Sequence, residues 1–294
     1  MILIAGCGYL GSYLIDALRE ITDEPILAAS RRPHKLVEAK DLMYATLDVT
    51  DDESVWALAE TAGGEARTVF YFAAFHNIDA LVGDPAAGAR VNLEGLRRFL
   101  SAFPETERLF FSSTDCVYGE NTAAFPAFPE SAPLAPVNEY GRQKALAEEI
   151  VHAAGFTAVR CGYMLGPSRT EKPHFYDRIV RSLQNGEETE MIDGMTRSVL
   201  SYRQAARCFA GLFRLSPEAL PQTVNLGGDE GLTKYEMGCR IADRIGAPRS
   251  LIRRITFDEG KKFFTDARAD SAVLDNRLLK SLLGLTELRW EGAP

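Results

Sequence analysis

The chain has 294 residues, of which 46% are hydrophobic and 25% charged, with a formal net charge of −8. These values fit a globular protein with a large and a smaller lobe, and no apolar run reaches membrane-spanning length. The acidic balance disfavours a nucleic-acid partner, and five scattered cysteines without a Cys-x-x-Cys pair disfavour disulfides and structural zinc. Because the first apolar run begins at Met1 without a basic leader, we expect a cytoplasmic protein with no membrane partner.

Short apolar runs alternate with helical patterns through the first half of the chain. The runs expected to form strands are, in chain order, residues 1–5, 25–29, 42–47, 68–72, 108–112 and 156–161. They lack strict two-residue alternation, which is typical of parallel strands buried between two layers of helices. The sequence therefore predicts an α/β fold built on a Rossmann-type, doubly wound parallel sheet.

The pattern becomes less regular after about residue 160. Helices are expected over residues 175–184, 202–214, 235–245 and 272–283, with short strands between them. We therefore predict a first domain over residues 1–160 and a smaller C-terminal α/β lobe over residues 161–294. Chain crossings between the two parts are left open.

A glycine-rich turn joins the first predicted strand to the first helix. Gly6, Gly8 and Gly11 follow the Gly-x-Gly-x-x-Gly spacing in the strand–turn–helix context that this motif requires. The first glycine permits the tight turn, the second lets the backbone approach a pyrophosphate, and the third lets helix and strand pack closely. Because anions bind at helix N-termini, we expect this turn, with Tyr9 and Leu10, to make the first domain an NAD(P)-binding Rossmann domain.

The end of the second predicted strand carries Ser30, Arg31 and Arg32, where NAD-specific sites present Asp or Glu to the ribose. An acid would repel a 2′-phosphate, whereas guanidinium groups bind it through charge-assisted hydrogen bonds. This favours NADP as the cofactor, with NAD as the alternative if the arginines are solvated surface charges. Asp48, after the third strand, either accepts the adenine amino group or begins a turn or helix cap.

Three polar side chains are candidates for catalysis. Tyr140 and Lys144 are one helical turn apart, so both project from the same helix face. A free tyrosine has a pKa of about 10, and we expect the nearby ammonium to lower the pKa of Tyr140. Thr114 follows the predicted strand 108–112 at its carboxyl end, the edge at which open α/β sheets bind ligands. Its hydroxyl is placed to orient a substrate carbonyl.

This combination resembles the extended short-chain dehydrogenases/reductases, and the similarity runs along almost the whole chain. The resemblance implies that Tyr140 exchanges a proton with the carbinol oxygen and that Thr114 polarises the carbonyl. It implies that Lys144 lowers the tyrosine pKa and contacts the nicotinamide ribose. The resemblance also implies that the C-terminal lobe binds the substrate and that a homodimer is possible.

The same resemblance places further residues by their positions in the family. Those expected near the cofactor are Ala73, Ala74 and Asn92. Those expected near the substrate are Asp115, Tyr163 and Arg197. The four histidines lack metal-ligand spacing, so no metal site is expected.

Several stretches resemble the dTDP-4-dehydrorhamnose reductases within that family: residues 73–79, 113–118, 136–144 and, most distinctively, 268–275. Sugar-nucleotide dehydratases carry Glu where this chain has Cys116, and a thiol with a pKa of about 8.5 is a poor base, which disfavours elimination. We therefore expect NADPH-dependent reduction of a 4-keto-6-deoxy nucleotide sugar. The alternatives are a nucleotide-sugar epimerase that retains its cofactor and a non-catalytic NADP-binding regulatory subunit.

Overall fold

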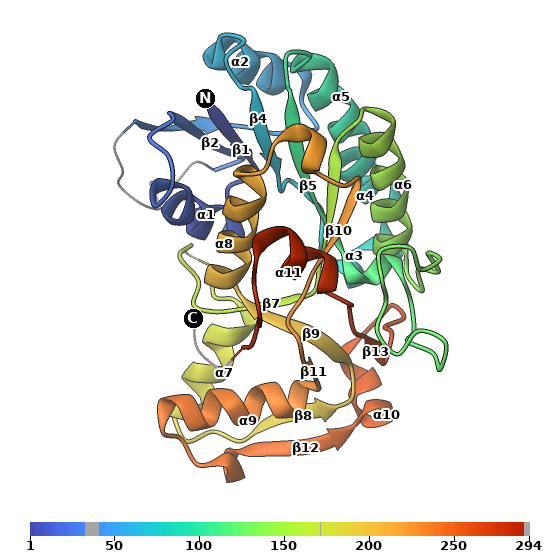
Figure 1. Ribbon diagram of the computed structural model, residues 1–294. Helices are drawn as coiled ribbons and strands as arrows, with labels where there is room; N and C mark the ends of the chain where they lie inside the picture. Colours follow the sequence, from blue (N-terminus) through green and yellow to red (C-terminus); the bar gives the residue numbers. More distant parts are fainter. Residues whose placement is uncertain (33–40, 171, 291–294) are drawn as a thin grey trace.

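The computed structural model describes residues 1–32, 41–170 and 172–290 (Figure 1). Its central feature is a seven-stranded sheet with the order β10-β6-β5-β4-β1-β2-β3, in which all neighbours run parallel. The strands are β1 (Ile2–Ala5), β2 (Ile26–Ser30), β3 (Leu42–Thr46), β4 (Thr68–Tyr71), β5 (Arg108–Thr114), β6 (Thr157–Cys161) and β10 (Thr223–Leu226). The predicted Rossmann-type α/β fold is confirmed.

Helices cover both faces of this sheet because alternate strand residues point to opposite sides. Ile2 and Ile4 of β1 enter one apolar core, whereas Leu3 and Ala5 enter the other, and all four are fully buried. The first core is completed by α1 (Tyr9–Arg19), α8 (Tyr202–Phe213) and α11 (Arg277–Leu283), and the second by α2 (Asp52–Ala62), α5 (Gly95–Ala102) and α6 (Glu139–Ala153). Burial on both faces explains the continuous apolar runs in the sequence.

The smaller lobe has its own strands and a separate apolar core, and lies below the main sheet in Figure 1. Its strands are β7 (Tyr163–Leu165), β9 (Thr196–Ser201), β11 (Gly231–Leu232) and β13 (Ser271–Ala272) in one sheet and β8 (Thr189–Asp193) and β12 (Ile252–Thr256) in another, with α7 (Phe175–Gln184) and α9 (Lys234–Ile245) packed on them. The chain crosses between the lobes, since α8 and β10 return to the main sheet. The domain boundary at residue 160 stays a prediction.

Shorter elements complete the described part of the chain. They are α3 (Ile78–Gly83), α4 (Pro85–Ala89), the π-helix η1 (Arg90–Glu94), α10 (Phe257–Gly260) and the 3-10 turns η2 (Asp115–Val117), η3 (Pro217–Ala219), η4 (Arg249–Leu251) and η5 (Lys261–Phe263). Within the residues that the structure describes, no helix has the length and apolarity needed to cross a bilayer.

Local signals explain most helix boundaries. Ser201 and Thr233 cap α8 and α9, each in a reciprocal capping box with Gln204 or Glu236 three residues later. Gly63 ends α2 with a φ of 57°, in the left-handed region that favours glycine.

One predicted helix needs correction. The helix expected over residues 272–283 begins only at Arg277, because Ser271 and Ala272 pair with β9 as strand β13. The backbone N–H of Asp275 then donates to the carbonyl of Phe128. Tertiary hydrogen bonding therefore overrides the helical pattern at the start of this segment.

Candidate active site

The glycine turn lies where the chain order of the sheet reverses, between β1 and β4. Gly6 has a φ of +93°, and a Cβ there would lie 2.3 Å from the backbone nitrogen of Ala73. A Cβ on Gly11 would lie 3.2 Å from Ile4 of β1, so this glycine permits close packing of helix and strand. At Gly8, by contrast, the nearest atom to an added Cβ would be 3.9 Å away. The turn thus leaves open space beside Gly8.

The N-terminus of α1 supplies hydrogen-bond donors at this open space. Gly8 is the N-cap residue and makes no side-chain cap, and the first turn contains no acidic residue. Among the described residues, no backbone acceptor pairs with the N–H groups of Tyr9, Leu10 and Gly11. These unpaired donors and the helix dipole favour an anion. The turn therefore fits the pyrophosphate of a dinucleotide.

Gly8→Ala tests this arrangement directly. Since a methyl group there meets no protein atom closer than 3.9 Å, we expect unchanged thermal stability but weaker dinucleotide binding, by roughly tenfold or more. Calorimetric titration with NAD and NADPH measures the affinity. The matched control is Gly83→Ala in α3, where an added Cβ meets nothing within 4 Å. Equal affinities for all three proteins would contradict the assignment of the turn.

The residues predicted to select the cofactor follow β2 and β3. Ser30 ends β2, and Arg31 and Arg32 lie exposed beyond it. The carboxylate of Asp48 accepts hydrogen bonds from the backbone N–H and the hydroxyl of Thr50, at 2.9 and 2.7 Å, and these contacts, with the charge of Arg31, lower the pKa of Asp48. Asp48 thus begins a turn, while Asp51 caps α2. The role of Asp48 at adenine stays a prediction.

Asn92 holds the loop after β4 in place. Its side chain accepts a hydrogen bond from the Phe75 N–H at 2.8 Å and donates to the Phe75 carbonyl at 3.2 Å. It also donates to Gln143 of α6 at 3.0 Å. The loop that Asn92 holds includes Ala73 and Ala74, which follow β4 at the carboxyl edge of the sheet. Asn92 therefore fixes the backbone of the loop at this edge of the sheet. Gln143 helps to hold Asn92 in place, and the sequence patterns did not indicate this role.

Thr114 and Tyr140 meet at the carboxyl end of β5. Thr114 is the last residue of that strand, and Tyr140 lies in the first turn of α6. Burial raises the pKa of Tyr140, and the acidic groups of Cys116, Cys161 and Asp115 raise it further, while a hydrogen bond with the Thr114 hydroxyl lowers it. The two side chains therefore lie side by side at this edge of the sheet, and each affects the ionisation of the site.

Lys144 corrects one expectation from the sequence. Its ammonium donates to the Ser112 carbonyl at 2.6 Å and lies 3.8 Å from the centroid of the Phe111 ring. Burial lowers the pKa of Lys144 to about 7. The expected lowering of the Tyr140 pKa by Lys144 is not found. Burial of the phenol raises its pKa, and the Lys144 ammonium is hydrogen-bonded to the Ser112 carbonyl on β5.

The three residues predicted to contact substrate come together beside Thr114. Asp115 and Arg197 are both buried, with 3.5 Å between the carboxylate Oδ2 and the guanidinium Nε. The charges of both also act on Tyr163, whose pKa is raised mainly by burial. A fourth residue, Lys234, reaches the same place, with its ammonium 3.3 Å from the Tyr163 ring centroid. No local sequence pattern indicates Lys234, because the direction of its side chain depends on how α9 packs.

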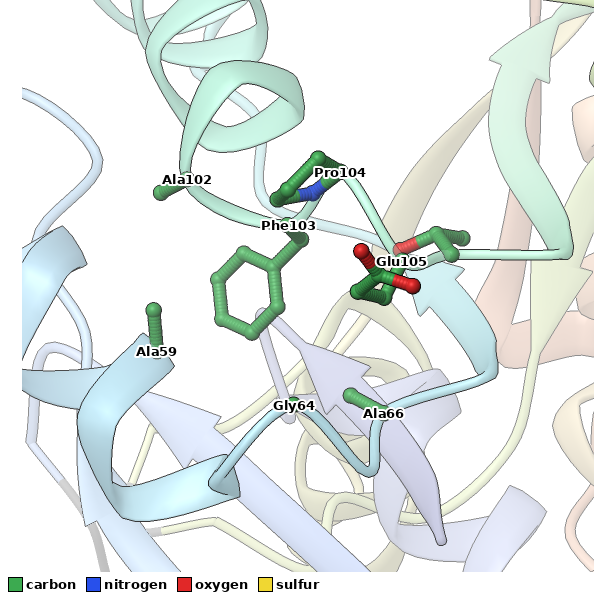
Figure 2. A pocket seen from close by; sticks show the side chains of 8 residues that line it. Ala59, Gly64, Ala66, Ala102, Phe103, Pro104 and Glu105 are labelled. Atoms are coloured by element: carbon green, nitrogen blue, oxygen red, sulfur yellow. The ribbon is translucent and has the colours of Figure 1, made fainter.

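The hollow in Figure 2 is not part of this site. It has a volume of about 50 Å³, too small for a nucleotide sugar. It lies at the amino ends of β4 and β5, the opposite edge of the sheet from Thr114. It is lined by Ala59, Gly64, Ala66, Ala102, Phe103, Pro104, Glu105 and Thr106.

Residues 2–227 match the NAD dependent epimerase/dehydratase family. The chain belongs to this family. The low-salt glycan biosynthesis protein Agl12 of Haloferax volcanii is 23% identical, with 93% of this chain and 92% of that protein covered. The methionine adenosyltransferase 2 subunit beta of Rattus norvegicus is 25% identical, with 98% and 87% covered. The UDP-glucose 4-epimerase of Halalkalibacterium halodurans is 27% identical, but the match spans only 52% of this chain and 45% of that epimerase.

Solved structures of such enzymes share the fold. The UDP-glucuronic acid 4-epimerase of Bacillus cereus, in complex with UDP-glucuronic acid and NAD, is 17% identical with a TM-score of 0.82, covering 99% of this chain and 95% of that one. The dTDP-glucose 4,6-dehydratase DesIV of Streptomyces venezuelae, with NAD bound, is 19% identical with a TM-score of 0.78, covering 99% and 93%. At these identities the likeness shows the fold alone. These neighbours bind NAD, so NADP and the closeness to reductases stay predictions.

Proposed function

We propose that this protein is a nicotinamide-dependent nucleotide-sugar epimerase, which oxidises and then re-reduces one carbon of the sugar while retaining its cofactor. The observation that carries the proposal is the meeting of Thr114 and Tyr140 at the carboxyl end of β5, the same sheet edge as the glycine turn. Membership of the epimerase/dehydratase family supports it. The earlier expectation of net reduction becomes the second candidate.

The proposed chemistry assigns one task to each side chain. A bound nicotinamide would supply the hydride acceptor and donor. Tyr140 would take the proton from the sugar hydroxyl and later return it. Thr114 would turn its hydroxyl from Asp115 and donate a hydrogen bond to the same sugar oxygen. Because burial raises the pKa of Tyr140, the phenol is set to protonate a carbonyl oxygen. Taking a proton would require Lys144 to turn from Ser112 toward the phenol.

The residues around Thr114 do not provide a suitable base for the elimination of water, which is the reaction of the dehydratases. Burial and the neighbouring Asp115 raise the pKa of the Cys116 thiol to about 12, so the thiol is neutral near pH 7. Asp115 is held by Arg197 and by a hydrogen bond from the Thr114 hydroxyl at 3.2 Å. We therefore favour reactions that change the oxidation state of one carbon and break no C–O bond.

The second candidate is NADPH-dependent reduction of a 4-keto-6-deoxy nucleotide sugar, favoured by Arg31 and Arg32 after β2. A panel of UDP- and dTDP-sugars, assayed with NAD and with NADPH, separates the possibilities. Product without net cofactor oxidation supports the epimerase, and net NADPH oxidation with a keto sugar supports the reductase. Tight cofactor binding without turnover across the panel would contradict both and support a regulatory subunit.

Arg31→Asp tests the choice of cofactor. If Arg31 binds a 2′-phosphate, the variant loses a charge-assisted hydrogen bond and adds repulsion, so we expect NADPH affinity to fall roughly ten- to a hundred-fold, with NADH affinity unchanged or higher. Fluorescence titration of both nucleotides gives the two constants. Arg97→Asp, an exposed arginine on α5, controls for the change in net charge. An unchanged ratio of NADPH to NADH affinity would show that Arg31 is a surface charge that does not contact the cofactor.

A further inference from the structure

Lys234 lies among the predicted substrate residues although it belongs to another element. It is the first residue of α9, and its ammonium lies 3.3 Å from the centroid of the Tyr163 ring and 4.7 Å from that of Phe175. Tyr163 comes from β7 and Phe175 from α7. Two aromatic rings from separate elements therefore hold this ammonium by cation–π contacts.

The charges around Lys234 do not balance. Asp115 pairs with Arg197 at 3.5 Å, and Arg268 pairs with Asp79 at 2.9 Å. Burial, together with the like charges of Arg197 and Arg268, holds the pKa of Lys234 well below its ordinary value, and the charge of Asp115 opposes this only in part. Among the described residues, no carboxylate forms an ion pair with the Lys234 ammonium. A protonated Lys234 is therefore a third cation beside two carboxylates, each of which already pairs with an arginine.

We propose that Lys234 binds an anionic oxygen of the substrate, supplied either by the diphosphate or by a carboxylate on the sugar. The inference rests on the proposed function, because it takes a nucleotide sugar as the ligand. Asp115, whose charge acts on Lys234, also accepts a hydrogen bond from the Thr114 hydroxyl at 3.2 Å. The ammonium is thus placed near the proposed reacting group, where an anion would form a charge-assisted hydrogen bond with it.

The stability of Lys234→Met without substrate provides a first readout. A lysine with a purely structural role would stabilise the fold, and its loss would lower the melting temperature. A cation that is partly buried and unpaired opposes folding, so we expect the melting temperature of Lys234→Met to equal or exceed that of the wild type. Methionine keeps most of the side-chain length and its contact with the rings. A clear drop in melting temperature would contradict the proposal.

Binding provides the second readout. Titrating NAD-loaded protein with UDP, UDP-glucose and UDP-glucuronic acid, we expect Lys234→Met to weaken binding by roughly ten- to a hundred-fold. An equal loss for all three ligands identifies the diphosphate as the anion, and a loss confined to UDP-glucuronic acid identifies the sugar carboxylate. Affinities within about twofold of the wild type for all three would overturn the proposal. A wild-type protein that binds neither these ligands nor the dTDP-sugars of the panel overturns the proposed function and this inference with it.

The matched control is Lys262→Met. The Lys262 ammonium lies 5.0 Å from the Phe263 ring centroid, but it pairs with Glu190 at 2.8 Å. The control therefore removes an ammonium beside a ring outside the cluster around Tyr163. We expect it to leave the affinities for the three ligands unchanged. A parallel loss in both variants would assign the effect to net charge and overturn the role of Lys234.

Discussion

Tyr140→Phe is expected to lower turnover by about 10²–10⁴-fold while leaving dinucleotide affinity unchanged. The substitution removes only the hydroxyl that would exchange a proton with the substrate, and the ring remains in the first turn of α6. Steady-state rates with the best substrate of the panel, together with titration by NAD, give the two quantities. The effect is expected in kcat, because proton transfer belongs to the chemical step.

A second tyrosine controls for the loss of a hydroxyl group. Tyr176 is buried in the core of the smaller lobe, where it packs with Ile179 and Leu183 of the same helix. Tyr176→Phe is expected to keep the wild-type rate. If Tyr140→Phe also turned over near the wild-type rate, the phenol would have no part in the chemistry, and the proposed epimerase mechanism would have to be abandoned.

The main sheet could be predicted from the sequence because its signals are local. Apolar runs such as residues 1–5 and 68–72 indicate strands buried on both faces, and the glycine spacing indicates the turn between β1 and α1. The structure places these strands at Ile2–Ala5 and Thr68–Tyr71. The order of the sheet then brings Gly6 and Ala73 together, although they are far apart in the sequence. Local pattern and parallel topology therefore suffice for the outline of the fold.

The fine arrangement of the site depends on contacts that no local pattern contains. The spacing of Tyr140 and Lys144 predicts a shared helix face but not the bond from Lys144 to Ser112, which lies on β5. The family position of Asn92 suggests a contact with the cofactor, whereas its side-chain amide is hydrogen-bonded to Phe75 and Gln143. In each case the partner comes from another element, and only the assembled fold brings it within hydrogen-bond distance.

A buried ion pair lies behind the proposed catalytic residues. Glu148 is one helical turn beyond Lys144 on α6, and its carboxylate pairs with Arg160 of β6 at 2.6 Å. The side chains are 6% exposed for Arg160 and 2% for Glu148. Ser113, the neighbour of Thr114, also donates to Glu148, and Arg160 donates to the Tyr118 hydroxyl at 2.6 Å. The network therefore joins α6, β5 and β6 directly beneath the site.

Arg160→Met is expected to lower the free energy of unfolding by about 3–5 kcal/mol, because it leaves the Glu148 carboxylate buried without its counter-charge. The double variant with Glu148→Leu removes both charges, so its loss should be smaller than that of Arg160→Met alone. Urea unfolding of the proteins at one pH gives these differences. Arg249→Met is the control: its pair with Asp243 is exposed, so we expect a change of about 0–1 kcal/mol. A similarly small change for Arg160→Met would mean that water or a rearranged neighbour neutralises Glu148, and the network would no longer explain how α6 is fixed against the sheet.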